Sequence, residues 1–562
     1  MKTLPVTTLL FFLTLAVCSQ IAPEKYFISF TDKNNSPYST DNPIEFLSQR
    51  SIDRRTNQGI AIDMTDLPVN PDYLQGVAET GATILNPSKW LNGVSIFTAN
   101  PAVLDAIEAL PYVAGITKSS NDLPAENDII ESFEKSFFKY ESYGQPAGPV
   151  LKDGHEIGIY DYGISLNQIG MLNGDAFHEL GYRGQGKVIA VLDAGFLNAD
   201  DLDVFDSLWQ NGQILGTRDF VRGGEVLFDE HPHGAMVLSC MGANFPGQLI
   251  GTAPKASFWL LRSEDGSSEY IIEEYNWVSA AEFADSVGAD VINSSLGYTE
   301  FNDPSQNHTY SDMNGDTAPA TIGADMAAAK GILVVNSLGN EGSNPWYYLS
   351  VPSDGDSVLG IGAVDPSGVY VGFSSHGPSF DGRVKPDVVA QGAVVYIADP
   401  YTNGFTYGGG TSFSSPILAG MAACLWQANP SLSNMQIADA IRQSASQYLT
   451  PDDFLGHGIP DFIVANNILT VISGPEEASI ELGVFPNPFK EEFTLVVNAG
   501  SDLKEGMLEI TDITGKVIGM KNVSLKNSGQ TEIDLLRKAP AGLYFLKMNL
   551  NGACSVVKLI KE

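Results

Sequence analysis

Short apolar runs alternate with longer stretches of helical periodicity over residues 186–446. A strand buried on both faces of a sheet is a continuous apolar run, whereas a helix repeats its apolar positions every three or four residues. The runs cover residues 188–192, 257–261, 291–293, 332–335 and 358–364, and the helical stretches cover 234–241, 272–287, 318–329 and 412–427. This alternation predicts an α/β fold with a doubly wound, mostly parallel sheet.

The segments on either side follow different patterns. Residues 26–119 mix short strands, at 26–30 and 94–97, with a helical stretch at 101–110, which is typical of a small α+β unit. Beyond residue 480, strands at 493–497, 507–510, 516–519 and 543–550 are separated by Gly, Asn and Pro, with no helical stretch between them. We therefore expect a C-terminal β-sandwich of about 80 residues.

The first 19 residues have the pattern of a secretory signal peptide: Lys2, an apolar stretch at 9–17, and then Cys18 and Ser19. A membrane anchor needs roughly 20 apolar residues, more than this run supplies. Lipid attachment through Cys18 is a second alternative, which the bulky Val17 disfavours. We expect six segments, with bounds 1–19, 20–119, 120–154, 155–470, 471–480 and 481–562, of which 120–154 and 471–480 are polar linkers.

Charge narrows the classes of partner. The 562 residues include 31 basic and 67 acidic side chains, a formal net charge of -36, which repels nucleic acids and anionic membranes. Residues 481–562 hold ten basic and ten acidic residues, so the excess acid lies upstream. Without the signal peptide, Cys240, Cys424 and Cys554 remain, too few for a disulfide framework. A Cys240–Cys424 bridge is conceivable, but buried free thiols are favoured.

Two polar side chains stand at the ends of predicted elements. The run at 188–192 ends in Asp193, and open α/β sheets carry their sites at the carboxyl ends of strands. A capping or turn aspartate is the alternative. His233 precedes Gly234 where the next helical stretch begins. His231 and His233 would also begin a metal site, but no third ligand follows at a recognisable spacing.

A glycine-rich turn, Gly408-Gly-Gly-Thr-Ser412, delivers a serine to the start of an apolar helical stretch. A serine there is ordinarily an N-cap. However, the glycines permit close approach of backbone, and the N–H groups at a helix start stabilise negative charge, so Ser412 suits a nucleophile. Asn340 follows the run at 332–335 on a Gly-flanked turn. Its amide can donate to an oxyanion, and a turn asparagine is the alternative.

Together, these four strings resemble the signatures of the subtilisin-like serine proteases (subtilases), in that family's chain order of Asp, His and Ser. The resemblance implies that Ser412 attacks the scissile carbonyl and that His233 acts as general base and then general acid. Asp193 would orient and stabilise the imidazolium. Asn340 and the backbone N–H of Ser412 would form the oxyanion hole.

The string at 291–297, which includes Ser295, Leu296 and Gly297, is similar to the family's substrate-binding strand. Such a strand pairs its backbone with the extended peptide. The loop that contains Ser350 resembles the floor of the pocket for the residue before the cleaved bond. A small side chain there would leave room for large apolar residues of the substrate.

Three positions depart from the family pattern. Ala194 stands in place of the usual Thr or Ser, Met236 in place of a second His, and Phe413-Ser414 in place of Met-Ala. None of these changes removes a catalytic atom. They affect support of the triad and the shape of subsites.

The flanking modules resemble known companions of the family. Residues 26–119, with Ser88-Lys-Trp-Leu-Asn, look like the propeptide of secreted bacterial subtilases, which blocks the cleft as an intramolecular inhibitor. The last module, with Val484-Phe-Pro-Asn-Pro-Phe489 and Gly542-Leu-Tyr-Phe545, resembles the sorting domain that type IX secretion machinery recognises. A carbohydrate-binding β-sandwich is the alternative, but no row of aromatics supports it. Maturation by cleavage within 120–154 is expected.

The resemblance requires no cofactor, and calcium enters only as an optional structural ion. Asp312, Asn314 and Asp316 offer oxygen ligands at alternate positions, as calcium loops do. The remaining ligands of such a loop do not follow, so a solvated acidic turn is favoured.

The sequence thus predicts a secreted or cell-surface serine endopeptidase, made as a zymogen and acting on proteins and peptides. A serine esterase is a rival, but α/β-hydrolases run Ser, acid, His and carry the nucleophile in Gly-x-Ser-x-Gly. A catalytically silent surface binding protein is the second rival. The complete set of triad residues disfavours it.

Overall fold

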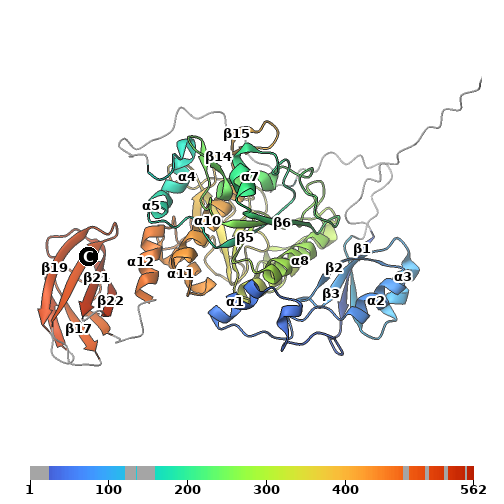
Figure 1. Ribbon diagram of the computed structural model, residues 1–562, viewed down its shortest axis with the longest axis horizontal. Helices are drawn as coiled ribbons and strands as arrows, with labels where there is room; N and C mark the ends of the chain where they lie inside the picture. Colours follow the sequence, from blue (N-terminus) through green and yellow to red (C-terminus); the bar gives the residue numbers. More distant parts are fainter. Residues whose placement is uncertain are drawn as a thin grey trace, which may run out of the picture.

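The computed structural model describes residues 24–120, 135, 158–472, 480–499, 505–524, 529–550 and 553–562. The predicted signal peptide and most of the two predicted linkers lie outside these residues. Figure 1 shows three bodies in chain order: a small α+β unit, a large α/β body and a β-sandwich. Among the helices described, none is long and apolar enough to cross a bilayer.

The large body is built on a seven-stranded parallel sheet with strand order β13-β12-β11-β10-β5-β9-β6. Its strands are β5 (Val188–Asp193), β6 (Ile214–Asp219), β9 (Ser257–Arg262), β10 (Val291–Ser294), β11 (Leu333–Ser337), β12 (Val358–Val364) and β13 (Val388–Gln391). The fold class predicted from the alternation is confirmed. The two outer strands, β6 and β13, were not among the predicted runs.

Helices cover both faces of this sheet. On one face lie α7 (His233–Gly242) and α10 (Thr411–Ala428), with α11 (Asn434–Ser444) and α12 (Phe462–Ile472) packed behind α10. On the other lie α8 (Ile272–Val287) and α9 (Pro319–Ala329). Ile189 and Val191 of β5 point into the first core, and Ala190 and Leu192 into the second. A strand buried on both sides therefore reads as an unbroken apolar run.

Local signals set the helix ends. Helix α8 ends where Gly288 takes φ 84°, a left-handed conformation that favours glycine. Helix α11 begins with a capping box, in which Ser433 and Gln436 satisfy each other's backbone N–H groups. These caps fix the length of helices that frame the sheet.

The N-terminal unit is a four-stranded antiparallel sheet of order β2-β3-β1-β4. It comprises β1 (Lys25–Phe30), β2 (Thr83–Ser88), β3 (Gly93–Phe97), β4 (Val113–Lys118), α1 (Gln49–Gln58), α2 (Pro71–Glu79) and α3 (Pro101–Glu108). Figure 1 shows this unit, in blue, beside α8 of the large body. Phe27 stacks on Tyr275 of α8, with ring centroids 4.2 Å apart.

The C-terminal unit consists of two antiparallel sheets, β16-β17-β20 and β19-β18-β21-β22, packed around one apolar core. The strands are β16 (Ile480–Phe485), β17 (Phe493–Ala499), β18 (Glu505–Asp512), β19 (Val517–Ser524), β20 (Gly529–Ile533), β21 (Gly542–Leu550) and β22 (Ala553–Lys561). This is the predicted β-sandwich.

Smaller elements complete the large body. They are α4 (Leu166–Gly170), α5 (Gly174–Glu179), α6 (Asp206–Gln210), and the paired strands β7 (Asn244–Phe245) with β8 (Leu249–Ile250) and β14 (Val395–Asp399) with β15 (Gly404–Gly408). Short 3₁₀ helices lie at Gly163–Ser165, Asp203–Phe205, Pro304–Gln306 and Tyr310–Asp312. One more, Pro43–Glu45, lies in the N-terminal unit.

Candidate active site

Asp193 and His233 form a buried hydrogen-bonded pair. Asp193 is the last residue of β5, and His233 is the first residue of α7. The Nδ1 atom of His233 lies 2.8 Å from Oδ1 and 3.0 Å from Oδ2 of Asp193, and the two side chains are 2% and 0% exposed. The backbone N–H of Ala194 donates to the same Oδ1 over 2.8 Å. These bonds hold the imidazole in one orientation.

Two glycines allow this approach. A Cβ on Gly234 would lie 2.4 Å from the carbonyl oxygen of Gly195 and 3.0 Å from the Cβ of Asp193. A Cβ on Gly195 would lie 2.4 Å from the backbone nitrogen of His231. The Gly residues beside the predicted Asp and His thus let the strand end and the helix start touch.

Ser412 occupies the first turn of α10, whose eighteen residues begin at Thr411. Pro416 has no N–H and cannot donate to the carbonyl of Ser412, as an ordinary helical residue would. The hydroxyl of Ser295 donates to that carbonyl instead, over 2.9 Å. The Oγ of Ser412 is buried and has no hydrogen-bond partner among the described residues.

His233 lies beside the start of this helix. Its ring centroid is 6.1 Å from that of Phe413, the residue after Ser412. The structure therefore brings Asp193 and His233 into contact and places His233 close to the turn that carries Ser412, although the chain separates these residues by 40 and 179 positions.

Asn340 points its amide at the same turn. Its Oδ1 accepts from the backbone N–H and from the hydroxyl of Thr411, both over 2.9 Å, which turns Nδ2 the other way. That Nδ2 is buried without a hydrogen-bond partner in the described part of the chain. A Cβ on Gly410 would lie 3.4 Å from Nδ2 and 3.7 Å from the backbone nitrogen of Ser412. The two donors therefore face one small space, which the glycine leaves open.

Comparison with known proteins identifies the family. Residues 184–458 match the family model described as "Subtilase family". Over 304 residues the chain is 30% identical to subtilisin E of Bacillus subtilis (strain 168). This alignment covers 53% of this chain and 69% of that protein. The chain belongs to the subtilase family. It is also 31% identical over 303 residues to subtilisin DY of Bacillus licheniformis, across 53% of this chain and 95% of the relative.

The flanks of this subtilase match two further family models. Residues 25–134 match "Peptidase S8 propeptide domain, Bacteroidota", and residues 483–562 match "Secretion system C-terminal sorting domain". The protein is therefore a secreted or cell-surface serine endopeptidase, with a propeptide that makes it a zymogen and a type IX sorting domain. The predicted family, activity and location are confirmed, and the esterase alternative is set aside.

Of the residues predicted to bind substrate, Ser295 contacts Ser412 directly, and Leu296, Gly297 and Ser350 lie in the segments around it. Leu296 is 2% exposed, and its carbonyl accepts from Nδ2 of Asn336 over 3.1 Å. Gly297 is followed by Tyr298, whose backbone pairs with Val351 in the Ser350 loop. Ser350 is buried, and its hydroxyl donates to the carbonyl of Leu338 over 3.1 Å, which keeps its side chain against the backbone. Their roles in binding stay predictions.

Sequence reasoning missed a hydrogen-bond chain that ends at Ser412. Ser415 donates to Oδ1 of Asn293 over 3.0 Å, and Nδ2 of Asn293 donates to Ser295 over 3.3 Å. Ser295 in turn donates to Ser412. Asn293 is a polar residue that directly follows Val291 and Ile292 in a buried strand, and this was the signal that pointed to a buried partner. The chain ties β10 to the start of α10.

His231 contributes shape rather than charge. Burial, and after it the nearby charge of His233, lowers its pKa to about 3, so the ring is neutral in the working range. Its ring centroid lies 6.3 Å from that of His233. Within the described residues, the only group with converging ligand atoms is Glu264, Glu269 and Glu273, so the zinc alternative at His231 gains no support.

Two residues that depart from the family pattern, and two cysteines, are buried in the large body. Ala194 is buried, and its carbonyl accepts from Nε of Arg262 over 2.9 Å, while Met236 packs in the α7 core. Cys240 and Cys424 are both buried free thiols, so they form no bridge. Burial raises the pKa of both thiols, which keeps them protonated and unreactive.

Proposed function

We propose that Ser412, His233 and Asp193 hydrolyse peptide bonds through an acyl-enzyme. His233 Nε2 takes the proton as Ser412 Oγ bonds to the carbonyl carbon, and it then protonates the leaving amine. In the second step, His233 takes a proton from the water that attacks the acyl-enzyme, and then returns a proton to Ser412 Oγ as the acid product leaves. The observation that carries the proposal is the 2.8 Å bond from His233 Nδ1 to Asp193. The His233 ring also lies 6.1 Å from that of Phe413, next to Ser412, whose buried Oγ has no hydrogen-bond partner among the described residues.

We assign the oxyanion hole to Nδ2 of Asn340 and the backbone N–H of Ser412. Both donors border the space beside Gly410. Ser412 lies in the first turn of α10, where the helix dipole adds to the stabilisation of negative charge. Because Thr411 fixes the amide before substrate arrives, no reorganisation is needed when the charge develops.

Asn340→Leu tests this assignment. The variant keeps the branching and number of side-chain heavy atoms but removes the donor, and we expect kcat to fall by about 10²–10³-fold with KM nearly unchanged. Steady-state hydrolysis of a fluorogenic peptide by the mature enzyme provides both constants. Thr411→Val is the matched variant: it loses one of the two bonds that orient the amide but keeps Nδ2, so its loss in kcat should be smaller. Equal losses in the two variants, or a rise in KM alone, would contradict the proposal.

We propose that residues 20–119 inhibit the enzyme until cleavage within 120–154 releases them. The supporting contacts run to α8. Asp285 is fully buried between Arg54, Arg55 and Lys89 of the propeptide, at 2.6–2.8 Å. Glu282 accepts from the hydroxyl of Ser88 over 2.5 Å.

The C-terminal sandwich would engage the secretion machinery, and it takes no part in the chemistry proposed above. Hydrolysis by the triad needs no cofactor. For calcium at 312–316, the oxygens of the turn already have local donors: Oδ2 of Asp312 accepts from Thr309, and Oδ1 of Asn314 accepts from the N–H of Asp316. A solvated acidic turn stays our interpretation.

We propose that the pocket beside Ser350 accepts large apolar side chains at the residue before the cleaved bond. The hydroxyl of Ser350 is bonded to backbone and does not project. Cleavage of a peptide library should favour Phe, Leu or Met over Asp and Gly there, by at least about tenfold in kcat/KM. Preference for acidic or very small residues would overturn this assignment.

A further inference from the structure

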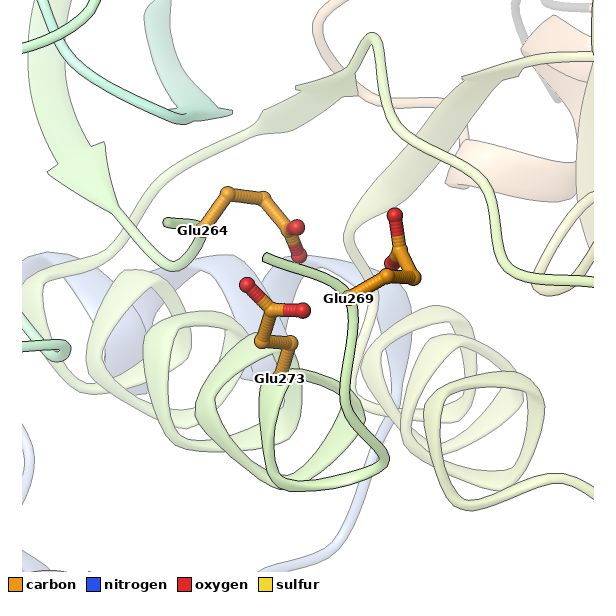
Figure 2. Close-up of side chains that lie close together, drawn as sticks. All are labelled: Glu264, Glu269 and Glu273. Atoms are coloured by element: carbon orange, nitrogen blue, oxygen red, sulfur yellow. The ribbon is translucent and has the colours of Figure 1, made fainter. Parts of the chain in front are cut away.

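Three buried glutamates of the large body converge on one another (Figure 2). Glu264 follows β9, Glu269 lies in the connecting loop, and Glu273 is in the first turn of α8. One oxygen of each lies within 4.8 Å of the others, and the residues are 1%, 7% and 0% exposed. Carboxylates so close together in a site without water repel one another and require a cation or protons.

The cation in this structure is the ammonium group of Lys135. Its Nζ lies 3.0 Å from Oε1 of Glu273 and 3.4 Å from Oε2 of Glu269, and it also bonds Oε2 of Glu264. The Lys135 side chain is only 3% exposed. Burial alone would lower its pKa, but the three glutamates outweigh burial and raise it well above the usual value. The cluster therefore accepts a primary ammonium group.

The peptidase domain itself holds these carboxylates in place. Glu273 accepts the backbone N–H groups of Asp265 and Tyr270, both over 2.9 Å. Glu264 accepts the hydroxyl of Tyr298. Glu269 has a buried Oε1 with no hydrogen-bond partner among the residues described. The hydrogen bonds that position the cluster therefore do not depend on Lys135, and Oε1 of Glu269 is an additional acceptor.

The cluster borders the elements that bind and cleave peptide. Tyr298 directly follows residues 295–297, which we predict to bind the substrate backbone. In the same loop as Glu264, a Cβ on Gly266 would lie 2.6 Å from Cδ2 of His231. The ring centroid of His231 lies 6.3 Å from that of His233, so the loop that carries Glu264 approaches the catalytic imidazole through His231.

We propose that Glu264, Glu269 and Glu273 form a subsite for a Lys or Arg side chain of the substrate, which Lys135 fills in the precursor. The inference rests on the proposed function, because Lys135 lies in the zone whose cleavage releases the propeptide. Once Lys135 leaves, three buried carboxylates have lost their counter-ion, and a basic substrate residue restores it. The substrates are then proteins with a basic residue a few positions from the cleaved bond.

The test uses mature enzyme and fluorogenic peptides that differ only by Lys or norleucine at one position, scanned along the chain. Norleucine keeps the apolar stem and removes the charge. At one position, Lys should raise kcat/KM by at least about 30-fold. Glu269→Gln should reduce this Lys-to-norleucine ratio to a few-fold, whereas Glu300→Gln, at an exposed position, should leave the ratio unchanged.

Equal cleavage of both peptides at every position would overturn the inference. If casein hydrolysis and serine-reagent labelling of Ser412 persist in that case, the proposed function survives without the subsite. Their absence would instead refute the proposed function. A Glu269-dependent rise in Tm on adding Ca²⁺, without any basic preference, would also overturn the inference and assign the cluster to a metal.

A second measurement needs no change to the enzyme and so avoids variants that fail to fold. A synthetic peptide covering residues 129–141 should inhibit the mature enzyme, and replacing Lys135 in it by norleucine should raise the inhibition constant by at least about 30-fold. Equal inhibition by the two peptides would contradict the subsite.

Discussion

Replacing Ser412 with alanine should lower kcat for peptide hydrolysis by about 10⁶-fold, the order of loss found for the nucleophile of subtilisin itself. The variant removes the atom that forms the acyl-enzyme, while Asn340 and the backbone N–H still bind the carbonyl oxygen. A small rate above that in water should therefore remain. Measurement requires titrated mature protein, with casein and a fluorogenic peptide as substrates.

Ser414→Ala is the matched control. Ser414 lies one residue beyond Phe413, and its hydroxyl donates to the carbonyl of Thr411 over 3.1 Å, away from the reaction. Its activity should stay within a few-fold of wild type. Adding His233→Ala to Ser412→Ala should cost almost nothing more, because the two residues act as a unit. Persistent, serine-reagent-sensitive activity in Ser412→Ala would assign the nucleophile elsewhere.

The central strands and the residues at their carboxyl ends could be predicted, because burial on both faces removes polar residues from central strands. The run at 358–364 coincides with β12, and Asp193 ends β5 as expected. The outer strand β6 was missed because only its first two residues, Ile214 and Leu215, are strongly apolar, and an irregularity between Ile214 and Gly216 interrupts its pairing. Edge strands are only half covered, so their sequence carries a weaker signal.

Contacts between distant residues could not be predicted. Glu264, Glu269 and Glu273 read as ordinary surface acids in a chain of net charge -36, and nothing local marks them as buried. Their partner Lys135 lies 129 residues before Glu264. Likewise, the bond from Thr411 to Asn340 spans 71 residues. Periodicity reports which face is buried, but not which polar groups meet there.

Replacing Asp285 with asparagine should free the propeptide. The aspartate is fully buried against two arginines and Lys89 of the propeptide. Burial alone would raise its pKa, but Lys89, Arg54 and Arg55 outweigh burial and hold it well below the usual 3.8. The variant leaves these three buried cations without their shared anion. The expected loss is about 3–5 kcal/mol, or about 10²–10⁴-fold in propeptide affinity.

The measurement follows two events in purified precursor: cutting of the chain on gels, and the appearance of activity on a fluorogenic peptide. In wild type, activity should lag behind the cut because the severed propeptide stays bound. In Asp285→Asn the lag should shrink at least about 100-fold. Asp201→Asn, at an exposed loop position, is the control and should keep the lag. An unchanged lag in Asp285→Asn would show that the contacts at α8 do not hold the cleaved propeptide on the enzyme.

Acid should act on the same contact. Because the pKa of Asp285 is lowered in the complex, its contribution is complete above the usual 3.8 and is lost as pH falls below that value. Burial raises the pKa of neighbouring Glu282, so that residue contributes in the opposite direction. The difference between wild type and Asp285→Asn therefore isolates Asp285. Propeptide affinity should converge in the two proteins at low pH, and divergence there would contradict the assigned ion pairs.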